Sequence, residues 1–230
     1  LVRWQHPVRG FVSPMEFIPV FEHNGFIFKL DQYVWEGACQ LLRKWMDEGR
    51  EPLPISVNVS RIDLYNANLT LILGDLLHKY DISPRLLELE ITERLLLEDS
   101  DKVSVRMQSL RELGIGIAID DFGTGYSSLA YLQRCGVTRL KIDRSFVKDI
   151  KSNEDHPIVS AIAGIARGFD IRLAAEGVER DEQMNALEIL GCDEMQGFLF
   201  SRPVNVDEAT RILQEFRLPC VISPEADVAS

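Results

Sequence analysis

The 230-residue sequence lacks any run of about 20 apolar residues and any recognisable secretory signal, so we expect no segment to span a membrane. Its cysteines have no CxxC or other metal-binding spacing. We therefore expect reduced thiols, as in a cytosolic protein, rather than a disulfide framework. The few histidines are scattered as well, which argues against a zinc site. These residues are Cys39, Cys135, Cys192, Cys220, His6, His23, His78 and His156.

Positive charge is also scarce, because 25 lysines and arginines face 36 aspartates and glutamates, a formal net charge of -11. General nucleic-acid binding needs a broad basic surface, and this composition argues against it. A small phosphate ligand remains compatible, since a few arginines or a bound metal ion can reverse the field locally. Nucleotide-binding loops are missing too: no GK[ST] follows Gly125, and no HRD loop precedes the Asp121-Phe122-Gly123 triplet.

Short apolar strand patterns alternate with longer helical patterns along the chain. The expected strands are 53–59, 86–91, 115–120, 139–142, 171–175 and 195–200, with residues 2–4 as the end of another. The expected helices are 14–23, 32–48, 69–80, 102–113, 127–135, 157–169, 181–190 and 206–216. The repeat length of about 30 residues is that of a βαβ unit. It predicts an α/β protein with a parallel sheet, open or closed into a barrel.

The most informative segment, residues 118–129, begins at the end of an apolar strand pattern and continues as a glycine-rich loop. Asp120 and Asp121 are adjacent there, and two neighbouring carboxylates repel each other unless a cation or a proton separates them. One bound divalent metal ion, or two, would resolve this repulsion. Gly123 and Gly125 would let the backbone turn sharply and approach a ligand closely.

Polar side chains also lie at the ends of nearly all the remaining expected strands. The residues in question are Asn58, Glu90, Asp120, Asp121, Lys141, Asp143, Glu176 and Gln196. In a parallel barrel these strand ends meet on one face, where such enzymes keep their chemistry. Carboxylate and amide oxygens suit hard cations, so the pattern favours Mg²⁺ or Mn²⁺.

Each of these residues also has a simpler interpretation. Glu90 could be the exposed member of an alternating strand, Lys141 a solvated or ion-paired lysine, and Asn58 a turn residue. Gln196 alone carries almost no information. Their shared position after successive strands favours a common site.

The sequence resembles a known family, the EAL domain, which is the cyclic di-GMP phosphodiesterase module of bacterial signalling. The resemblance runs from Leu1 to about Phe216 and covers many motifs in order. They are RW at 3–4, HP at 6–7, PMEFIP at 14–19, NVS at 58–60, EITE at 90–93, DDFGTGYSSL at 120–129, KIDRSF at 141–146, AEGVE at 175–179 and QGFLFSRP at 196–203.

The resemblance implies a TIM-like (β/α)8 barrel with an antiparallel first strand, and metal-dependent hydrolysis of cyclic di-GMP to linear pGpG. By similarity, two ions, Mg²⁺ or Mn²⁺, would be held by Asn58, Glu90, Asp120, Asp121 and Glu176. The same similarity assigns catalytic roles to Lys141, Glu176, Asp121 and Gln196. Glu93 matches the residue that stabilises the glycine-rich loop, and Arg3 matches a contact to the substrate phosphate. The family also implies a homodimer through the loop at 120–129.

One departure from the family pattern lies at the beginning of the sequence. Leu1 matches the leucine of the E-A-L signature, so the metal-binding glutamate would precede the chain, and the first barrel strand would be absent. We expect residues 1–217 to form the EAL phosphodiesterase domain and residues 218–230 a flexible C-terminal tail. A sensor or GGDEF domain would lie upstream in a longer parent protein. The domain is expected in the cytoplasm, alone or as the cytoplasmic part of a membrane-anchored parent.

Two other functions remain open from the sequence. If the signature glutamate is truly missing, the domain would be a receptor that binds cyclic di-GMP without cutting it. A metal-dependent lyase or isomerase, with Lys141 as the base, would also gather carboxylates at strand ends. That enzyme would act on small carboxylic acids and not on dinucleotides.

Overall fold

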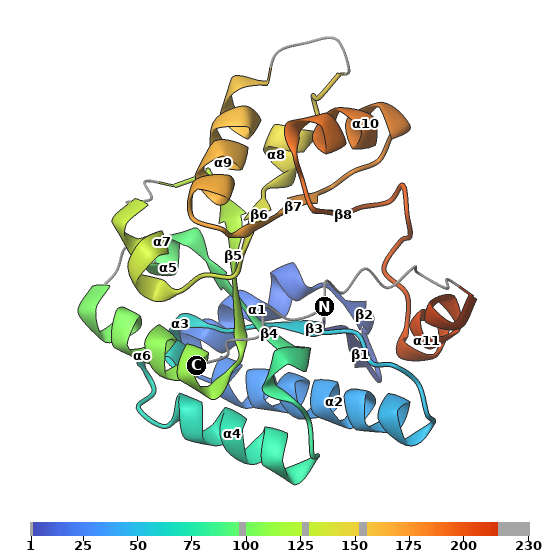
Figure 1. The fold of residues 1–230 in the computed structure, drawn as a ribbon. Helices are drawn as coiled ribbons and strands as arrows, with labels where there is room; N and C mark the ends of the chain where they lie inside the picture. The colour runs from blue at the N-terminus through green and yellow to red at the C-terminus, as the bar shows by residue number, and fades with distance from the viewer. Residues whose placement is uncertain (1, 97–99, 126–128, 152–155, 216–230) are drawn as a thin grey trace.

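A parallel sheet forms the centre of the computed structural model, which describes residues 2–96, 100–125, 129–151 and 156–215 (Figure 1). Its six strands follow one another in chain order, each parallel to the next. They are β3 (Ile55–Asn58), β4 (Leu87–Thr92), β5 (Gly116–Phe122), β6 (Arg139–Ile142), β7 (Arg172–Glu176) and β8 (Glu194–Gln196). The sheet curls into part of a barrel, in agreement with a TIM-like fold that lacks its first strand.

Helices connect these strands and cover the outer face of the sheet (Figure 1). They are α1 (Pro14–Asn24), α2 (Ile27–Asp47), α3 (Arg61–Tyr65), α4 (Leu69–Lys79), the 3-10 turn η1 (Pro84–Leu86), α5 (Glu93–Leu96), α6 (Ser100–Leu113), α7 (Leu129–Cys135), α8 (Arg144–Val147), α9 (Pro157–Gly168), α10 (Asp181–Leu190) and α11 (Val206–Glu215). Contacts join α2 to β3, α6 to β5, and α9 to β6 and β7. Throughout the described ranges, no helix has both the length and the apolar character that crossing a membrane requires.

Alternation along the strands separates an apolar outer layer from a polar interior. In β4, Leu87, Leu89 and Ile91 are fully buried in the apolar layer that also contains side chains of α2, α4 and α6. Glu88 and Glu90 alternate with them and point to the inside of the curled sheet, as the two-residue period of a strand requires. The main apolar core therefore lies between sheet and helices, and the interior is left for polar chemistry.

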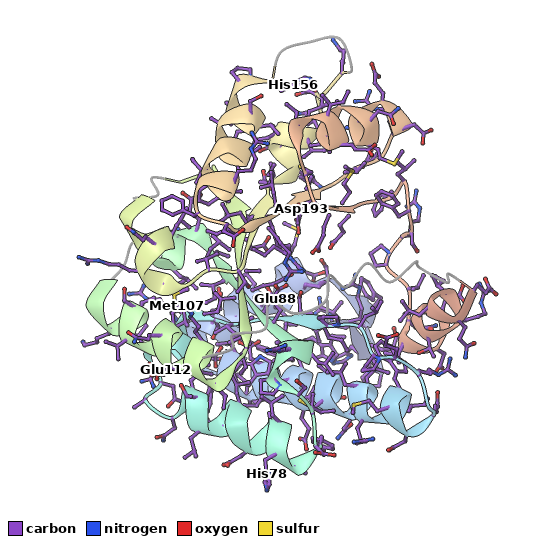
Figure 2. All side chains as sticks on the ribbon, viewed as in Figure 1. His78, Glu88, Met107, Glu112, His156 and Asp193 are labelled. Atoms are coloured by element: carbon purple, nitrogen blue, oxygen red, sulfur yellow. The ribbon has the colours of Figure 1, made fainter. Side chains whose placement is uncertain are left out.

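The lower part of this interior is filled by paired charges. Arg139 on β6 contacts Glu88 at 2.6 Å and Glu194 on β8 at 2.8 Å. Arg172 on β7 reaches Glu194 at 3.1 Å, and Ser56 donates to Glu88 at 2.8 Å. Glu88 lies near the centre of the molecule (Figure 2). Barrels of this type usually fill their interior with layers of branched apolar residues, so this ionic layer is a distinctive feature of the chain.

The structure corrects several expected boundaries. Residues 4–6 and 10–12 form the antiparallel hairpin β1 (Trp4–His6) and β2 (Gly10–Val12), of which the sequence suggested only a strand end at 2–4. Helix α2 begins at Ile27 and not at residue 32. The short helices α3 and α8 were not expected, because four or five residues give no helical period to detect.

The strand expected at 195–200 is wrong beyond Gln196. A side chain on Gly197 would clash with the backbone of Val178, with a built Cβ only 2.1 Å from its carbonyl oxygen. The amide of Leu199 donates to that same oxygen and the amide of Phe200 to Gly197, so the chain turns here. Phe198 and Phe200 are about half exposed. Their apolar side chains continue a strand-like pattern in the sequence, but the close approach of Gly197 to the backbone of Val178 prevents a strand here.

Several expectations lie wholly or partly outside the described residues. These are the tail at 218–230, residues 126–128 of the glycine-rich loop, and Cys220. The cysteines Cys39, Cys135 and Cys192 are unpaired thiols.

Candidate metal and phosphodiester site

Most of the residues singled out in the sequence lie at the carboxyl ends of the parallel strands. Asn58, Glu176 and Gln196 are the last residues of β3, β7 and β8. Asn58 pairs in register with Glu90, and Glu176 with Gln196. Because successive parallel strands end at one edge, these side chains share the rim of the curled sheet.

Lys141 is the centre of the group that the fold brings together. Its Nζ lies 2.8 Å from Glu90, 3.1 Å from Asp120 and 2.6 Å from Glu176. The lysine is buried and the three carboxylates are largely so. One ammonium thus joins carboxylates from three strands, β4, β5 and β7, and holds them close together at the rim.

These contacts shift the protonation of the lysine and of Glu176. Burial disfavours the charged ammonium, but attraction to Glu90, Asp120 and Glu176 outweighs it and raises the pKa of Lys141 above its ordinary value. Burial also raises the pKa of Glu176; contact with Lys141 opposes this, and repulsion from Asp120 and Glu90 adds to it. Lys141 therefore stays a cation at neutral pH and is no proton acceptor.

A second grouping is suited to a divalent cation. Within the described ranges, ligand oxygens of Asp120, Asp121 and Glu176 all lie within 4.8 Å of one another. Three carboxylates with no histidine or thiol match the ligand set of Mg²⁺ or Mn²⁺ rather than zinc. Two of these carboxylates, Asp120 and Glu176, already contact a cation, Lys141, so the donor set fits a metal ion by its chemistry.

The backbone is strained at the second of the adjacent aspartates. Asp121 has φ of 53°, in the left-handed region that only a few per cent of non-glycine residues adopt. The ladder between β5 and β6 also shifts register between Ile119 and Phe122. This bulge lets two successive residues aim at one rim, whereas a regular strand would point them to opposite faces.

The surroundings of Asp121 include Asp143, a strand-end residue to which the sequence assigned no role in the site. Burial, repulsion from Asp120 and Asp143, and a hydrogen bond to Asp143 raise the pKa of Asp121, while Lys141 acts in the opposite direction. Asp143 also caps α8 by accepting from the amide of Ser145 at 3.0 Å. Its position directly after β6 was the available signal in the sequence, and the N-cap role is a finding of the structure.

Glu93 binds the glycine-rich loop directly. This glutamate opens α5 and is 2% exposed, and its Oε2 accepts from the amides of Gly123 at 2.8 Å and Gly125 at 3.1 Å. Gly123 has φ of 96°, and a Cβ there would lie 3.0 Å from the ring of Phe146. The loop that follows the two aspartates is thus fixed to the end of β4 by a buried carboxylate.

Gln196, which pairs in register with Glu176, lies together with Arg3 on one side of the strand ends. Both line a pocket of about 710 Å³ between the hairpin, the end of β8 and α11. Phe198 and Arg202 also line it, and the guanidinium of Arg202 stacks 4.7 Å from the ring centre of Phe198. The pocket offers cationic and aromatic groups, which suit an anionic ligand with flat rings.

The position of Asn58 depends on a residue that sequence reasoning missed. Trp35 of α2 is fully buried, and its Nε1 donates to the backbone oxygen of Asn58 at 3.0 Å. A tryptophan within an apolar helical stripe reads as ordinary core, so no sequence signal linked it to the site.

A curled parallel sheet with acidic residues converging at its carboxyl rim defines the class: barrel proteins suited to hold divalent cations at the ends of their strands. Within that class, the profile described as the EAL domain matches residues 1–203. The chain belongs to the EAL domain family.

Two of the curated relatives come from Pseudomonas aeruginosa. The bifunctional diguanylate cyclase/cyclic di-GMP phosphodiesterase MucR is 39% identical over 209 residues, which are 90% of this chain and 30% of that protein. The cyclic di-GMP phosphodiesterase NbdA is 40% identical over 218 residues, 94% of this chain and 28% of that protein. The chain thus spans less than a third of the length of these relatives.

A solved structure with the same fold is described as the PaMucR phosphodiesterase in complex with c-di-GMP. It matches with a TM-score of 0.85 and 39% sequence identity, over 91% of this chain and 85% of that one.

Proposed function

We propose that this domain hydrolyses one phosphodiester bond of cyclic di-GMP to give linear pGpG, using divalent metal ions. The observation that carries the proposal is the convergence of Glu90, Asp120 and Glu176 on Lys141, with Asp121 beside them. Relatives named as cyclic di-GMP phosphodiesterases, and a similar structure solved with c-di-GMP, support the choice of substrate.

The substrate would span from the pocket that Arg3 lines to the carboxylate cluster. Arg3 and Arg202 would neutralise phosphate charge, and Phe198 would stack on a guanine. Gln196 ends β8 next to Glu176, between pocket and cluster, where its amide would orient the reacting phosphate or water. These few cations fit one small anionic ligand on a chain that is acidic overall.

Asn58, Glu90, Asp120, Asp121 and Glu176 would hold Mg²⁺ or Mn²⁺. Ions bound there would supply positive charge for the phosphoryl oxygens and make a water molecule more acidic.

The residues of the chain support an in-line displacement. A water oxygen forms a bond to phosphorus, the bond from phosphorus to the 3′ oxygen breaks, and a proton ends on that leaving oxygen. Asp121, whose carboxylate lies with those of Asp120 and Glu176, would accept the proton of the water. Lys141 would offset the negative charge that develops on phosphorus-bound oxygens. Since its pKa is raised and not lowered, a lyase or isomerase with Lys141 as base is disfavoured.

Glu93 would keep the glycine-rich loop in the conformation that presents both aspartates. We also keep a homodimer through this loop as part of the proposal. The chain spans less than a third of MucR, whose name includes a diguanylate cyclase activity. We therefore still expect a GGDEF or sensor domain in the same polypeptide. We expect the EAL domain itself to be located in the cytoplasm.

The proposal is tested by incubating the protein with cyclic di-GMP and Mg²⁺ or Mn²⁺ and following pGpG by chromatography. Asp120→Asn should lower kcat at least about 100-fold, because a ligand to the metal is lost. Asp75→Asn, an exposed aspartate on α4, is the matched control and should leave turnover unchanged. Tight binding without product would identify a receptor instead, and an Asp120→Asn variant with normal turnover would remove the assigned site.

A further inference from the structure

Two aspartates outside the proposed catalytic cluster are buried together behind β3. Asp31 on α2 is 7% exposed and Asp63 on α3 is fully buried. They belong to the region where α2 packs against β3 and α3. Two carboxylates in such a place cannot both be ionised without a large cost in free energy.

The hydrogen bonds show how the pair is accommodated. Asp63 Oδ2 accepts from the amide of Ser60 at 2.8 Å and from its hydroxyl, in a capping box at the beginning of α3. The two buried oxygens that have no such donor are Asp31 Oδ2 and Asp63 Oδ1, one from each carboxyl. A single proton between the two side chains satisfies both oxygens. Because Ser60 already stabilises the negative charge of Asp63, the proton belongs to Asp31.

The same face of α2 holds the strand end that carries Asn58. Trp35 follows Asp31 by one helical turn and donates to the backbone oxygen of Asn58 at 3.0 Å. The contact of Trp35 with Asn58 therefore fixes the end of β3. The contact of Asp31 with Asp63, five residues after Asn58, fixes the first turn of α3. We propose that Asp31, Asp63 and Trp35 form a clamp, held closed by one shared proton, that positions Asn58 at the rim. The metal-binding role of Asn58 rests on the proposed function, whereas the shared proton does not.

The protonation of Asp31 agrees with this geometry. Burial, followed by a hydrogen bond to Asp63 and repulsion from it, raises the pKa of Asp31 to about 8. Other charged groups line the pocket of about 450 Å³ beside Asp31, from α1, α3 and α5. They are Glu22, Arg61 and Arg94.

The clamp gives stability a definite dependence on pH. In the unfolded chain Asp31 loses its proton near its ordinary pKa of about 4, whereas the folded protein keeps that proton up to about 8. This contribution is thus complete below pH 4 and is lost as the pH rises through 8. Above 8 both carboxylates are charged and repel each other. The segment from Asn58 to Asp63 then loses one of its two attachments to α2.

Asp31→Asn tests the shared proton, since an amide can donate to Asp63 at every pH. The ratio of the unfolding equilibrium constant of the wild type to that of Asp31→Asn should rise about tenfold per pH unit between pH 5 and 8. Urea titrations at several pH values measure it. Asp47→Asn, an exposed position on the same helix, should follow the wild type. Parallel curves for wild type and Asp31→Asn would overturn the shared proton.

Calorimetric titration with Mn²⁺ tests the positioning. Asp31→Asn should bind Mn²⁺ with the same affinity as the wild type at pH 7. At pH 9 it should bind Mn²⁺ at least threefold more tightly than the wild type does. Trp35→Phe should weaken Mn²⁺ binding at both values without changing the slope of stability against pH. Equal affinities in all variants would overturn the clamp as a positioning device. A second Mn²⁺ bound by the wild type but not by Asp31→Asn would show a cation in place of the proton and overturn the proposal. If no variant binds Mn²⁺, the proposed function fails, while the urea experiment still decides the shared proton.

Discussion

Replacing Lys141 with methionine removes the cation that three carboxylates share at the rim of the sheet. Methionine keeps the length and the apolar stem, so the substitution changes charge more than packing. Glu90, Asp120 and Glu176 would then face one another across a largely buried space. Breaking a buried ion pair by removing one partner costs about 3–5 kcal/mol. Because these carboxylates keep some exposure to water, we expect the lower end, about 3 kcal/mol, for the metal-free protein at pH 8.

The loss should shrink in acid and in the presence of metal. Without Lys141, the carboxylates of the folded protein hold protons to a higher pH than those of the unfolded chain. The variant is therefore most stable near pH 5 and becomes less stable as the pH rises toward 8. Mn²⁺ replaces the missing positive charge, so it should stabilise the variant more than the wild type.

Urea titrations at pH 5 and pH 8, each with and without Mn²⁺, give the four free energies of unfolding that this prediction requires. Lys44→Met, an exposed lysine on α2, is the matched control and should change none of them by more than about 0.5 kcal/mol. Activity should be lost in Lys141→Met at every pH. A variant as stable as the wild type at pH 8 without metal, or one that Mn²⁺ stabilises no further, would refute the account of a shared cation.

The structure makes three further predictions. Glu93→Ala leaves two loop amides without their acceptor, so it should lower the free energy of unfolding by about 3 kcal/mol in urea titrations and reduce pGpG formation. Gly123→Ala should lower it by about 1–2 kcal/mol, because φ of 96° disfavours a side chain that would also press on Phe146. The raised pKa values of Glu176 and Asp121 mean that protons compete with metal in weak acid. Affinity of the wild type for Mn²⁺, measured by calorimetry, should therefore rise from weakly acidic to neutral pH, and it should fall again above pH 8, where the clamp opens.

Much of the fold could be predicted from the sequence because strand and helix periods differ and repeat regularly. Strands β3 to β7 lie where the apolar runs predicted them, and the expected family is correct. The errors have local physical causes. At the end of β8, Phe198 and Phe200 continue an apolar pattern, but Gly197 packs against the backbone of Val178 and forces a turn. No periodicity reports such a contact.

The candidate site was predictable in its residues and not in its internal contacts. Acidic and amide residues after successive strands had to meet at one rim once the sheet was parallel. The clustering of three carboxylates around Lys141 depends on side-chain reach, which spacing along the chain does not give. Asp31 illustrates the limit most clearly. A charged residue on the buried stripe of a long helix was visible, but its partner, Asp63, lies 32 positions away.

The ionic layer below the site has a consequence for how this domain can vary during evolution. Arg139 bonds to Glu88 and to Glu194, so one guanidinium links charges on three strands, with Arg172 adding a second cation at Glu194. Loss of Arg139 would leave the carboxylate of Glu88, whose side chain is only 5% exposed, without its close cationic partner, which is far more damaging than a small gap among branched hydrocarbons. Among homologous domains the three should therefore be inherited as a unit, replaced together by uncharged side chains or retained together.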